Sequence, residues 1–555
     1  MPFFSAKLSK IMWFLTALFI TLFFIQPIIS IFYQSWTVNW QNIQHLWQTV
    51  FTDYVANSVL LVIGTVFFSL IFALPCAWFV SQYQFRGQRI LQWLLCLPLA
   101  MPAYLVGYLY TDLLDYAGPV QVFLRQTFTW QSGQDYWFPP IRTLGGACIV
   151  LALVLYPYIF LLVRLALLEQ SENLIQSARL LGATPRKLLQ KVIFPLVRPA
   201  IAVGCALVAM ETLGDFGTVS YFAVPTLTTA VYDTWLGLGD LATASQLSVF
   251  ILLLIFSLLI LENYSRRKQK TYQRGYEKKT ELKRLSGIKC IFVQGYCWSL
   301  VAFAFFIPTL QLSYWAIHYF EQAQLRYFTE YAYNSLLISV IASIICIIFA
   351  LLLHFYQRLN LRSKAIQKTT QYALHLSGLS YAIPGTVLAI GILIPYTFAD
   401  HQLNALLKWL DLSPVGLIFS GSIFALVSAY VIRFSAMALG GIQTSLQKIA
   451  PTLDMASQSL GTNGIKMLKK VHFPLLSKGI LTALLMVFIE CMKELNASLL
   501  LRPFNFDTLA TYVFAFTSDE QLENAALPAL TLILVGLMPV IWLTRSLILT
   551  TQRDR

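Results

Sequence analysis

The chain has 555 residues, of which 57% are hydrophobic and 12% charged, and its formal net charge at pH 7 is +14. A soluble domain carries roughly 25% charged residues, so this composition excludes an ordinary soluble enzyme and favours a membrane protein. Because a helix needs about 20 apolar residues to cross the hydrocarbon core, apolar runs of that length are the first feature to locate.

Twelve apolar runs of about this length follow one another along the chain. They are 11–33, 57–80, 91–111, 145–168, 197–213, 246–263, 288–313, 334–356, 373–397, 415–437, 476–492 and 527–549. The first run is too long for a signal peptide, and no small-x-small cleavage site follows it, so we expect a retained helix. The sequence therefore predicts an all-α integral membrane protein with about 12 transmembrane helices.

The distribution of Lys and Arg predicts the orientation of these helices. With the N-terminus in the cytoplasm and 12 crossings, 33 of the 39 basic residues fall on cytoplasmic segments or toward the cytoplasmic ends of the runs. The six that fall outside are Arg125, Arg142, Arg326, Lys408, Lys493 and Arg502. Both termini are then cytoplasmic. The positive charge reflects this topology and contact with membrane lipid, and we expect no nucleic-acid partner.

Two stretches in the first half of the chain recur in the second half. "NSVLLVIG" begins at Asn57 and "NSLLISVI" at Asn334, an offset of 277 residues, and each opens the second run of a six-run set. "TLTTAVY" begins at Thr226 and "TLATYVF" at Thr508, an offset of 282. The order is kept, so the chain reads as a tandem duplication.

Six is an even number, so both halves enter and leave the membrane on the same side. We therefore predict two parallel six-helix repeats, related by an axis along the membrane normal. Residues 1–263 form the first half and residues 288–555 the second. Residues 264–287, "YSRRKQKTYQRGYEKKTELKRLSG", form a basic cytoplasmic linker between them.

A basic segment also recurs, between the fourth and fifth helices of each half on the cytoplasmic side. The first basic segment is residues 177–195, "SARLLGATPRKLLQKVIFP", and the second is residues 456–474, "ASQSLGTNGIKMLKKVHFP". Gly182 and Gly461 match, and we expect each to end a short helix. Both segments close on Phe-Pro, where Pro is expected to mark the turn into the membrane.

Between the matched Gly and Pro of each segment, apolar residues repeat at helical spacing. They are Leu188, Leu189 and Val192 in the first segment, and Met467, Leu468 and Val471 in the second. A short amphipathic helix in the cytoplasm needs a surface on which to lay its apolar face. The membrane surface and a groove on another protein are both open.

The two basic segments resemble the EAA loop of permease subunits in binding-protein-dependent ABC importers. That pattern is Glu-Ala-Ala, three residues, Gly, nine residues and Ile-x-Leu-Pro. The matching positions are Gln176, Ser177, Ala178, Gly182 and Pro195 in the first copy, and Met455, Ala456, Ser457, Gly461 and Pro474 in the second. The initial Glu is absent from both copies, which removes any salt bridge at that position.

The resemblance implies that each loop is a coupling helix that sits in a cleft of an ATPase subunit. Two loops on one chain imply two copies of an ATP-binding subunit and no second permease chain. The chain has no GxxxxGK[ST] phosphate-binding loop, so it is expected to be a non-catalytic membrane subunit. ATP is then used by the partner, and this chain binds no cofactor. A separate periplasmic receptor and a bacterial inner membrane are further implications.

Four acidic residues lie in or near the membrane at the ends of runs five and eleven. They are Glu211, Asp215, Glu490 and Glu494. Such residues are costly in hydrocarbon and should face the bundle interior, so they are candidates for the translocation path. Carboxylates suit a hard cation or a polyamine. The alternative is that they pair with Lys493, Arg502 or hydroxyl groups. The scattered His and Cys residues show no metal-binding motif.

Two longer stretches resemble the fused two-half ferric-iron permeases of this family. They are "DFGTVSYFAVPTLTTAVYDTWLGLGDLATASQLS" and "KELNASLLLRPFNFDTLATYVF". The resemblance implies ferric iron as the substrate, delivered by a periplasmic ferric-binding protein, and transport by alternating access. Importers of thiamine, polyamines and phosphonates have related permeases and remain the alternative.

Two other classes of membrane protein fit the sequence less well. An ion-coupled secondary transporter also has two parallel six-helix repeats, but it does not explain a matched basic loop in each half. A membrane-embedded enzyme needs clustered His residues, a nucleophile beside carboxylates or a metal motif, and the sequence offers none of these.

Overall fold

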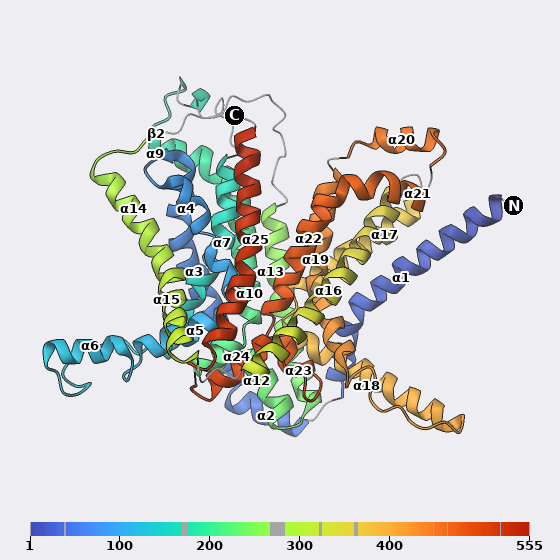
Figure 1. Ribbon diagram of the computed structural model, residues 1–555, viewed down its shortest axis with the longest axis horizontal. Helices are drawn as coiled ribbons and strands as arrows, with labels where there is room; N and C mark the ends of the chain where they lie inside the picture. The colour runs from blue at the N-terminus through green and yellow to red at the C-terminus, as the bar shows by residue number, and fades with distance from the viewer. Residues whose placement is uncertain are drawn as a thin grey trace. The chain divides into compact units, whose positions relative to one another are not determined.

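The computed structural model describes residues 2–37, 40–168, 176–178, 180–266, 283–320, 325–359, 364–447, 449–462, 464–521 and 523–553 (Figure 1). Most of the linker lies outside these residues. The described residues are almost entirely helical. Their one strand pairing is a two-residue parallel ladder between β1 (Tyr83–Gln84) and β2 (Lys283–Arg284).

The helices of the first half follow the predicted runs closely. They are α1 (Pro2–Ser35), α2 (Trp40–Thr49), α3 (Phe51–Gln82), α4 (Gln88–Leu94), η1 (Leu97–Ala100), α5 (Ala103–Leu114), α6 (Pro119–Phe128), α7 (Leu144–Leu168), α9 (Pro185–Leu188), η2 (Leu189–Ile193), α10 (Phe194–Gly214), α11 (Gly217–Tyr221), α12 (Leu227–Tyr232), η3 (Asp233–Gly237) and α13 (Leu241–Arg266).

The second half repeats this order. Its helices are α14 (Ile288–Val301), η4 (Ala302–Phe306), α15 (Ile307–His318), α16 (Leu325–Leu359), α17 (Lys364–Leu379), η6 (Ser380–Ala382), α18 (Gly385–Trp409), α19 (Ile423–Gln447), α20 (Pro451–Ser459), α21 (Ile465–Met467), η7 (Leu468–His472), α22 (Phe473–Lys493), α23 (Asn496–Leu501), α24 (Leu509–Ser518) and α25 (Ala526–Arg553).

Within the described residues, nine helices are long and apolar enough to cross a membrane, or ten if one bent pair counts as a single span. The bent pair is Gln88–Ala100 with Ala103–Phe128 and corresponds to predicted run three. Run nine corresponds to α17 together with α18, and run twelve corresponds to α25. Every predicted run overlaps a helix, and the chain is an all-α membrane protein. Run ten is predicted to start too early, because residues 415–422 are not helical and α19 begins at Ile423.

The third spanning element of each half is broken in the same way. A 3-10 turn, η1 or η6, precedes Pro102 in the first half and Pro384 in the second. Both prolines are extended, with ψ of 136° and 146°, and a new helix starts directly after each. Since Pro cannot donate to the preceding turn and disfavours helix in the residue before it, the break is local and repeated.

The compact units of the structure do not follow the two sequence halves. One unit contains residues 1–43, 231–249 and 324–515, and the other contains 44–230, 250–323 and 516–555. The first helix, α1, therefore packs with helices of the second half. In the same way α14, α15 and α25, which belong to the second half, pack with helices of the first.

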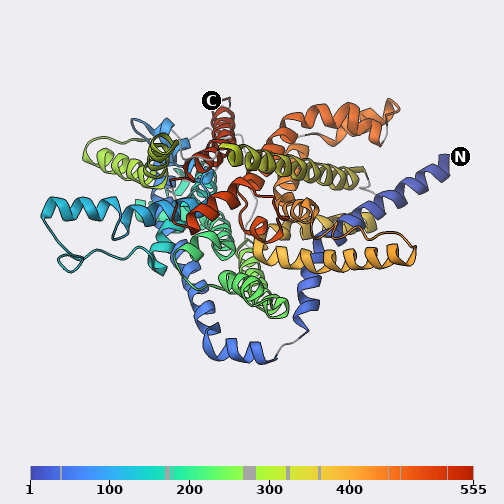
Figure 2. The same ribbon diagram turned by 60° about the horizontal axis from the view of Figure 1, so that its bottom comes forward.

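Close backbone contacts fix these exchanged helices. A Cβ atom at Gly391 of α18 would lie 2.6 Å from the carbonyl oxygen of Pro27 in α1. Figure 2 shows α1 beside α17 and α18. In the other unit, a Cβ atom at Gly536 of α25 would lie 2.6 Å from the carbonyl oxygen of Ala100 in η1. Glycine lets the backbones approach this closely, as is common between membrane helices.

One helix forms the centre of each unit. In the most apolar stretch of α7, and likewise of α19, 72% of the residues are buried, whereas only 28% are buried in α1 and in α3. The outer helices expose large apolar side chains, among them Phe19, Leu60 and Ile63. In a membrane these side chains face lipid, so their exposure carries no cost there.

Candidate functional site

The first basic segment contains the helix end that the sequence predicts. Residues 176–178 and 180 are helical, and Gly182 follows with a φ of +79°. The N–H of Ala183 donates to the carbonyl oxygen of Ala178 at 3.0 Å. This is the hydrogen bond of a Schellman cap, in which a left-handed residue, usually Gly, satisfies carbonyl groups at the end of a helix.

The second basic segment repeats this geometry. Gly461 has a φ of +79°, and the N–H of Thr462 donates to the carbonyl oxygen of Ser457 at 3.0 Å. The hydroxyl groups of Ser457 and Thr462 are also hydrogen-bonded to each other. Among the described residues, nothing lies within 4 Å of a Cβ atom placed at Gly182 or Gly461, so both glycines serve backbone conformation and not close packing.

The expectation that Pro195 and Pro474 mark a turn is wrong. Each is the second residue of a spanning helix, α10 or α22, and the five residues before that helix, Leu189–Ile193 or Leu468–His472, form a π-helical turn. The wider turn accommodates the ring and the missing N–H group, so the helix continues through the proline.

The predicted apolar residues between Gly and Pro are unevenly buried, and one of them, Leu189, is 43% exposed. Leu188 is 7% exposed and Met467 is 1% exposed. The most exposed apolar residues of the two segments come directly before the glycines, with Leu181 at 87% and Leu460 at 83%. The largest exposed apolar side chains therefore lie at the end of the helix that precedes each glycine, where Gln176, Ser177, Met455 and Ala456 are also exposed.

The repeated motifs at Asn57 and Thr226 are bonded to each other. Asn57 Nδ2 donates to the carbonyl oxygen of Pro225 at 3.0 Å, and Ser58 Oγ accepts from the N–H of Leu227 at 2.9 Å. The N–H of Thr226 donates to Thr229 Oγ1 at 2.9 Å. These bonds hold the start of α12 against α3.

The second half has the same three bonds. Asn334 Nδ2 donates to the carbonyl oxygen of Asp507 at 3.1 Å, and Ser335 Oγ accepts from the N–H of Leu509 at 2.7 Å. The N–H of Thr508 donates to Thr511 Oγ1 at 2.9 Å. A polar junction that recurs atom for atom shows that the duplication extends to the fold, and that these motifs are structural.

Asp215 caps a short helix next to α10. Its Oδ1 atom accepts hydrogen bonds from the N–H groups of Thr218 and Val219 at 3.0 and 3.2 Å, and Oδ2 accepts from the Thr218 hydroxyl at 3.0 Å. The free N–H groups at the start of α11 are satisfied in this way. Asp215 thus has a local structural partner.

Glu494 plays the corresponding part in the second half and is also ion-paired. Its Oε1 atom accepts from the N–H of Ala497 at 3.0 Å and from Arg433 Nη1 at 3.1 Å. The side chains of Glu494 and Arg433 are 7% and 9% exposed. Glu490 pairs with Lys493 at 3.0 Å.

The partner of Glu494 was not among the predicted ones. The predicted alternatives were Lys493, Arg502 and hydroxyl groups, whereas the observed partner is Arg433, which lies within run ten. An arginine inside an apolar run is itself a signal of an internal partner, since the charge is costly in lipid. Among the described residues, no group of three His, Cys, Asp or Glu side chains is placed to hold a metal ion.

Gly385 lies against this ion pair and gives a first prediction. A Cβ atom there would lie 2.6 Å from Glu494 Oε1 and 2.7 Å from Arg433 Nη1. Gly385→Ala is therefore expected to destabilise the protein by about 1–3 kcal/mol through overpacking. Thermal unfolding in detergent measures the effect. The control is Gly378→Ala, where the added methyl meets nothing within 4 Å. Equal midpoints for the two variants would contradict the prediction.

Comparison with known proteins shows which family this architecture resembles. Residues 69–271 match the family model described as "Binding-protein-dependent transport system inner membrane component". The chain is 25% identical over 510 residues to the Fe(3+)-transport system permease protein FbpB 2 of Haemophilus influenzae, covering 91% of this chain and 92% of that protein. It is 24% identical to the ferric transport system permease protein FbpB of Actinobacillus pleuropneumoniae, covering 92% of this chain and 74% of that protein.

A shorter relative matches part of the chain at higher identity. The molybdenum transport system permease protein ModB of Escherichia coli is 31% identical over 223 residues, covering 39% of this chain and 92% of that protein. A complete single-unit permease therefore corresponds to less than half of this duplicated chain. With its multiple apolar helices, the chain is a multi-pass inner membrane protein and belongs to the family of binding-protein-dependent transport system inner membrane components.

Proposed function

We propose that this permease carries ferric iron. The observation that carries the proposal is the extent of similarity: two relatives that match more than nine-tenths of the chain are named as ferric or Fe(3+) transport permeases. The molybdenum permease matches 39% of it. The fused arrangement of two halves is thus shared with the iron permeases along nearly the whole chain.

The exposed helices before Gly182 and Gly461 support the proposed ATPase partner. Each presents a large apolar side chain, Leu181 or Leu460, on a basic segment. An exposed amphipathic helix of this kind fits a groove on another protein. In this proposal two copies of a separate ATP-binding subunit receive the two helices, and both chain termini lie in the cytoplasm. ATP is used by that subunit.

Transport would then follow from alternating access. A periplasmic ferric-binding protein docks on the loops near 112–144, 214–245, 398–414 and 493–526. Closure of the ATPase dimer moves the two basic segments, and the helices attached to them open the path outward. The substrate enters, and hydrolysis resets the helices.

In this proposal the acidic residues attract the cation along the translocation path but do not bind iron as a complete set of ligands. Asp215, Glu490 and Glu494 already have partners within hydrogen-bonding distance. A transported ion has to leave its site quickly, so transient attraction serves better than a complete set of ligands. Glu211 remains the fourth candidate.

Uptake of radioactive Fe(III) by iron-starved cells tests the substrate. Cells with and without the gene are compared, and thiamine, a polyamine and a phosphonate serve as parallel substrates. Loss of iron uptake alone is the expected result. Unchanged iron uptake with loss of another substrate would replace iron by that substrate. Uptake that continues after ATP depletion and stops with a protonophore would favour ion coupling.

A further inference from the structure

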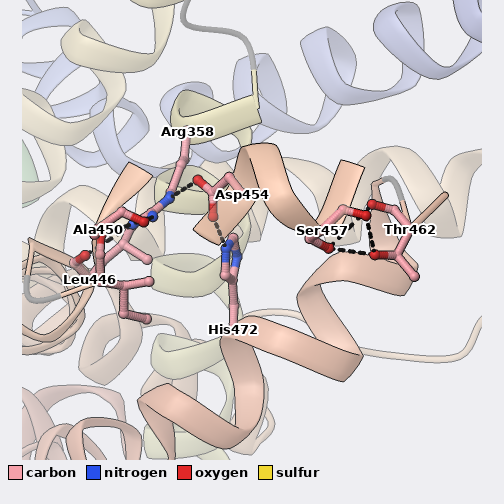
Figure 3. Close-up of polar contacts among 8 residues, drawn as sticks. Arg358, Leu446, Ala450, Asp454, Ser457, Thr462 and His472 are labelled. Atoms are coloured by element: carbon pink, nitrogen blue, oxygen red, sulfur yellow. Dashed lines mark hydrogen bonds and ion pairs between the residues drawn. The ribbon is translucent and has the colours of Figure 1, made fainter. Parts of the chain in front are cut away.

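Three side chains from distant parts of the chain meet at α20, the helix that leads into the second basic segment (Figure 3). Asp454 of α20 accepts a hydrogen bond at Oδ2 from Arg358 Nε, at 2.5 Å, and at Oδ1 from His472 Nε2, at 2.7 Å. Their side chains are 12%, 11% and 0% exposed, in the same order. These three residues are called the anchor cluster below.

Each member of the anchor cluster belongs to a different helix. Arg358 stands at the end of α16, and His472 closes η7 directly before α22. One carboxylate therefore ties α20 to two spanning helices. His472 is further held by the ring of Phe355, whose centroid lies 5.4 Å away in an edge-on arrangement.

Arg358 also fixes the connection between α19 and α20. Its Nη1 atom donates to the carbonyl oxygen of Leu446 at 3.0 Å, and Nη2 donates to those of Ile449 and Ala450 at 3.0 and 3.4 Å. Carbonyl groups at a helix end are otherwise unsatisfied and carry partial negative charge. A single guanidinium thus binds the end of one helix and the carboxylate of the next.

The electrostatics of Asp454 agree with a permanently ionised anchor. Burial raises the pKa of its carboxyl group, but hydrogen bonds from Arg358 and His472 lower it more, so the pKa lies below its usual range. The carboxylate is therefore charged at physiological pH. Charge-assisted hydrogen bonds of this kind are about twice as strong as neutral ones.

The sequence of the first half has no counterpart of the anchor cluster. The offsets of 277 and 279 that align the repeats bring Ser81, Ile175 and Ile193 to the positions of Arg358, Asp454 and His472. Ile175 lies outside the described residues, and Ile193 is 5% exposed. None of the three side chains is ionisable, so the aligned positions of the first half cannot form this ionic link.

We propose that Asp454 is a positioning residue for energy coupling, and that through Arg358 and His472 it links movement of α20 directly to α16 and α22. The first half has no ionisable side chain at the three corresponding positions. The two basic segments then differ in their connection to the spanning helices. The second is held to α16 and α22 by an ionic link and moves together with them. This inference rests on the proposed ATP-driven mechanism but not on iron as the substrate.

The test uses the permease with its ATPase subunits and receptor in proteoliposomes, and measures substrate taken up per ATP hydrolysed. Asp454→Asn is expected to lower this ratio at least tenfold while ATP hydrolysis continues. Ser459→Ala, on the same helix and exposed, is the control and should keep the wild-type ratio, because its hydroxyl bonds only to the carbonyl oxygen of Met455. A wild-type ratio for Asp454→Asn would overturn the inference.

A triple variant separates positioning from stability. Removing one partner of a buried pair leaves the other charge uncompensated, whereas replacing all members by apolar groups is often tolerated. Arg358→Ser, Asp454→Ile and His472→Ile together copy the first half. We expect the triple variant to be present in the membrane in normal amounts. Its ratio of substrate taken up to ATP hydrolysed is expected to stay low. Recovery of the wild-type ratio would assign the anchor cluster a purely structural role and overturn the proposal.

The wild-type complex distinguishes the two proposals. If it takes up another substrate with ATP but no iron, ferric transport fails, and the ratio is measured with that substrate. If wild-type uptake occurs without ATP hydrolysis, the ATP-driven mechanism fails and the coupling inference fails with it.

Discussion

Arg433→Leu is expected to lower the stability of the protein by about 3–5 kcal/mol, because it leaves Glu494 buried without its counter-charge. Glu494 is 7% exposed, and the N–H of Ala497, which also donates to its carboxylate, is a single neutral donor. Thermal unfolding of the purified protein in detergent should show the lower midpoint. The amount of protein in the membrane should fall as well, since marginally stable proteins are degraded.

A second replacement tests this explanation. Arg433→Leu combined with Glu494→Gln removes both charges and keeps an oxygen that can accept from Ala497. The double variant is expected to recover most of the lost stability. As a control, Lys493→Gln disrupts the Glu490 pair, which is partly exposed, and should cost below about 1 kcal/mol. A double variant as unstable as the single one would show that the buried charge is not the cause.

Uptake measured with the double variant then tests whether Glu494 belongs to the scaffold or to the translocation path. If stability and transport both recover, the carboxylate is part of the scaffold. If stability recovers and transport does not, its charge belongs to the path. Either result shows whether Glu494, one of the four predicted path residues, takes part in translocation.

Gly182→Asp is expected to leave the protein inserted but to reduce uptake about 5–30-fold, the effect of 1–2 kcal/mol on a conformational equilibrium. Gly182 has a φ of +79°, where an L-residue is strained by about that energy. A carboxylate would also lie at the C-terminal end of a helix, where negative charge is unfavourable. No atom lies within 4 Å of the added Cβ, so folding itself should be unaffected.

Gly287→Asp provides a matched control. Gly287 is also exposed and has a φ of +68°, and a Cβ atom placed there meets nothing within 4 Å, but this glycine lies at the start of α14, outside both basic segments. The variant should keep near-normal uptake. Normal uptake by Gly182→Asp, measured at equal amounts in the membrane, would remove the basic segment from the mechanism.

Local patterns in the sequence were enough to predict the helices and their duplication. A run of about 20 apolar residues has few alternatives to a helix in lipid, so each of the 12 runs overlaps a helix, although α19 begins eight residues after the predicted start of run ten. Gly182 and Gly461 were correctly expected to end helices, because a left-handed cap strongly favours glycine. The prediction of a turn at Pro195 and Pro474 was wrong, because a π-helical turn accommodates a proline ring that an ordinary helical turn cannot.

Contacts between distant residues were not predictable in the same way. Arg433 and Glu494 are 61 residues apart, and Arg358 and Asp454 are 96 apart. No periodicity connects such pairs, and each acid has several basic residues at similar separations. The exchange of α1 and α25 between sequence halves has the same origin, because a helix that is apolar all round does not specify its neighbours.

The exchange of helices has a consequence for synthesis of the chain. The unit that contains α1 is complete only when residue 515 has been made, and the other unit only when α25 follows. At about 5–20 residues per second, roughly 25–100 s pass between the synthesis of α1 and the completion of its unit. Neither unit can therefore mature co-translationally far ahead of the other. A premature stop late in the message, before α24, would leave both units unfinished and expose the whole product to membrane proteolysis.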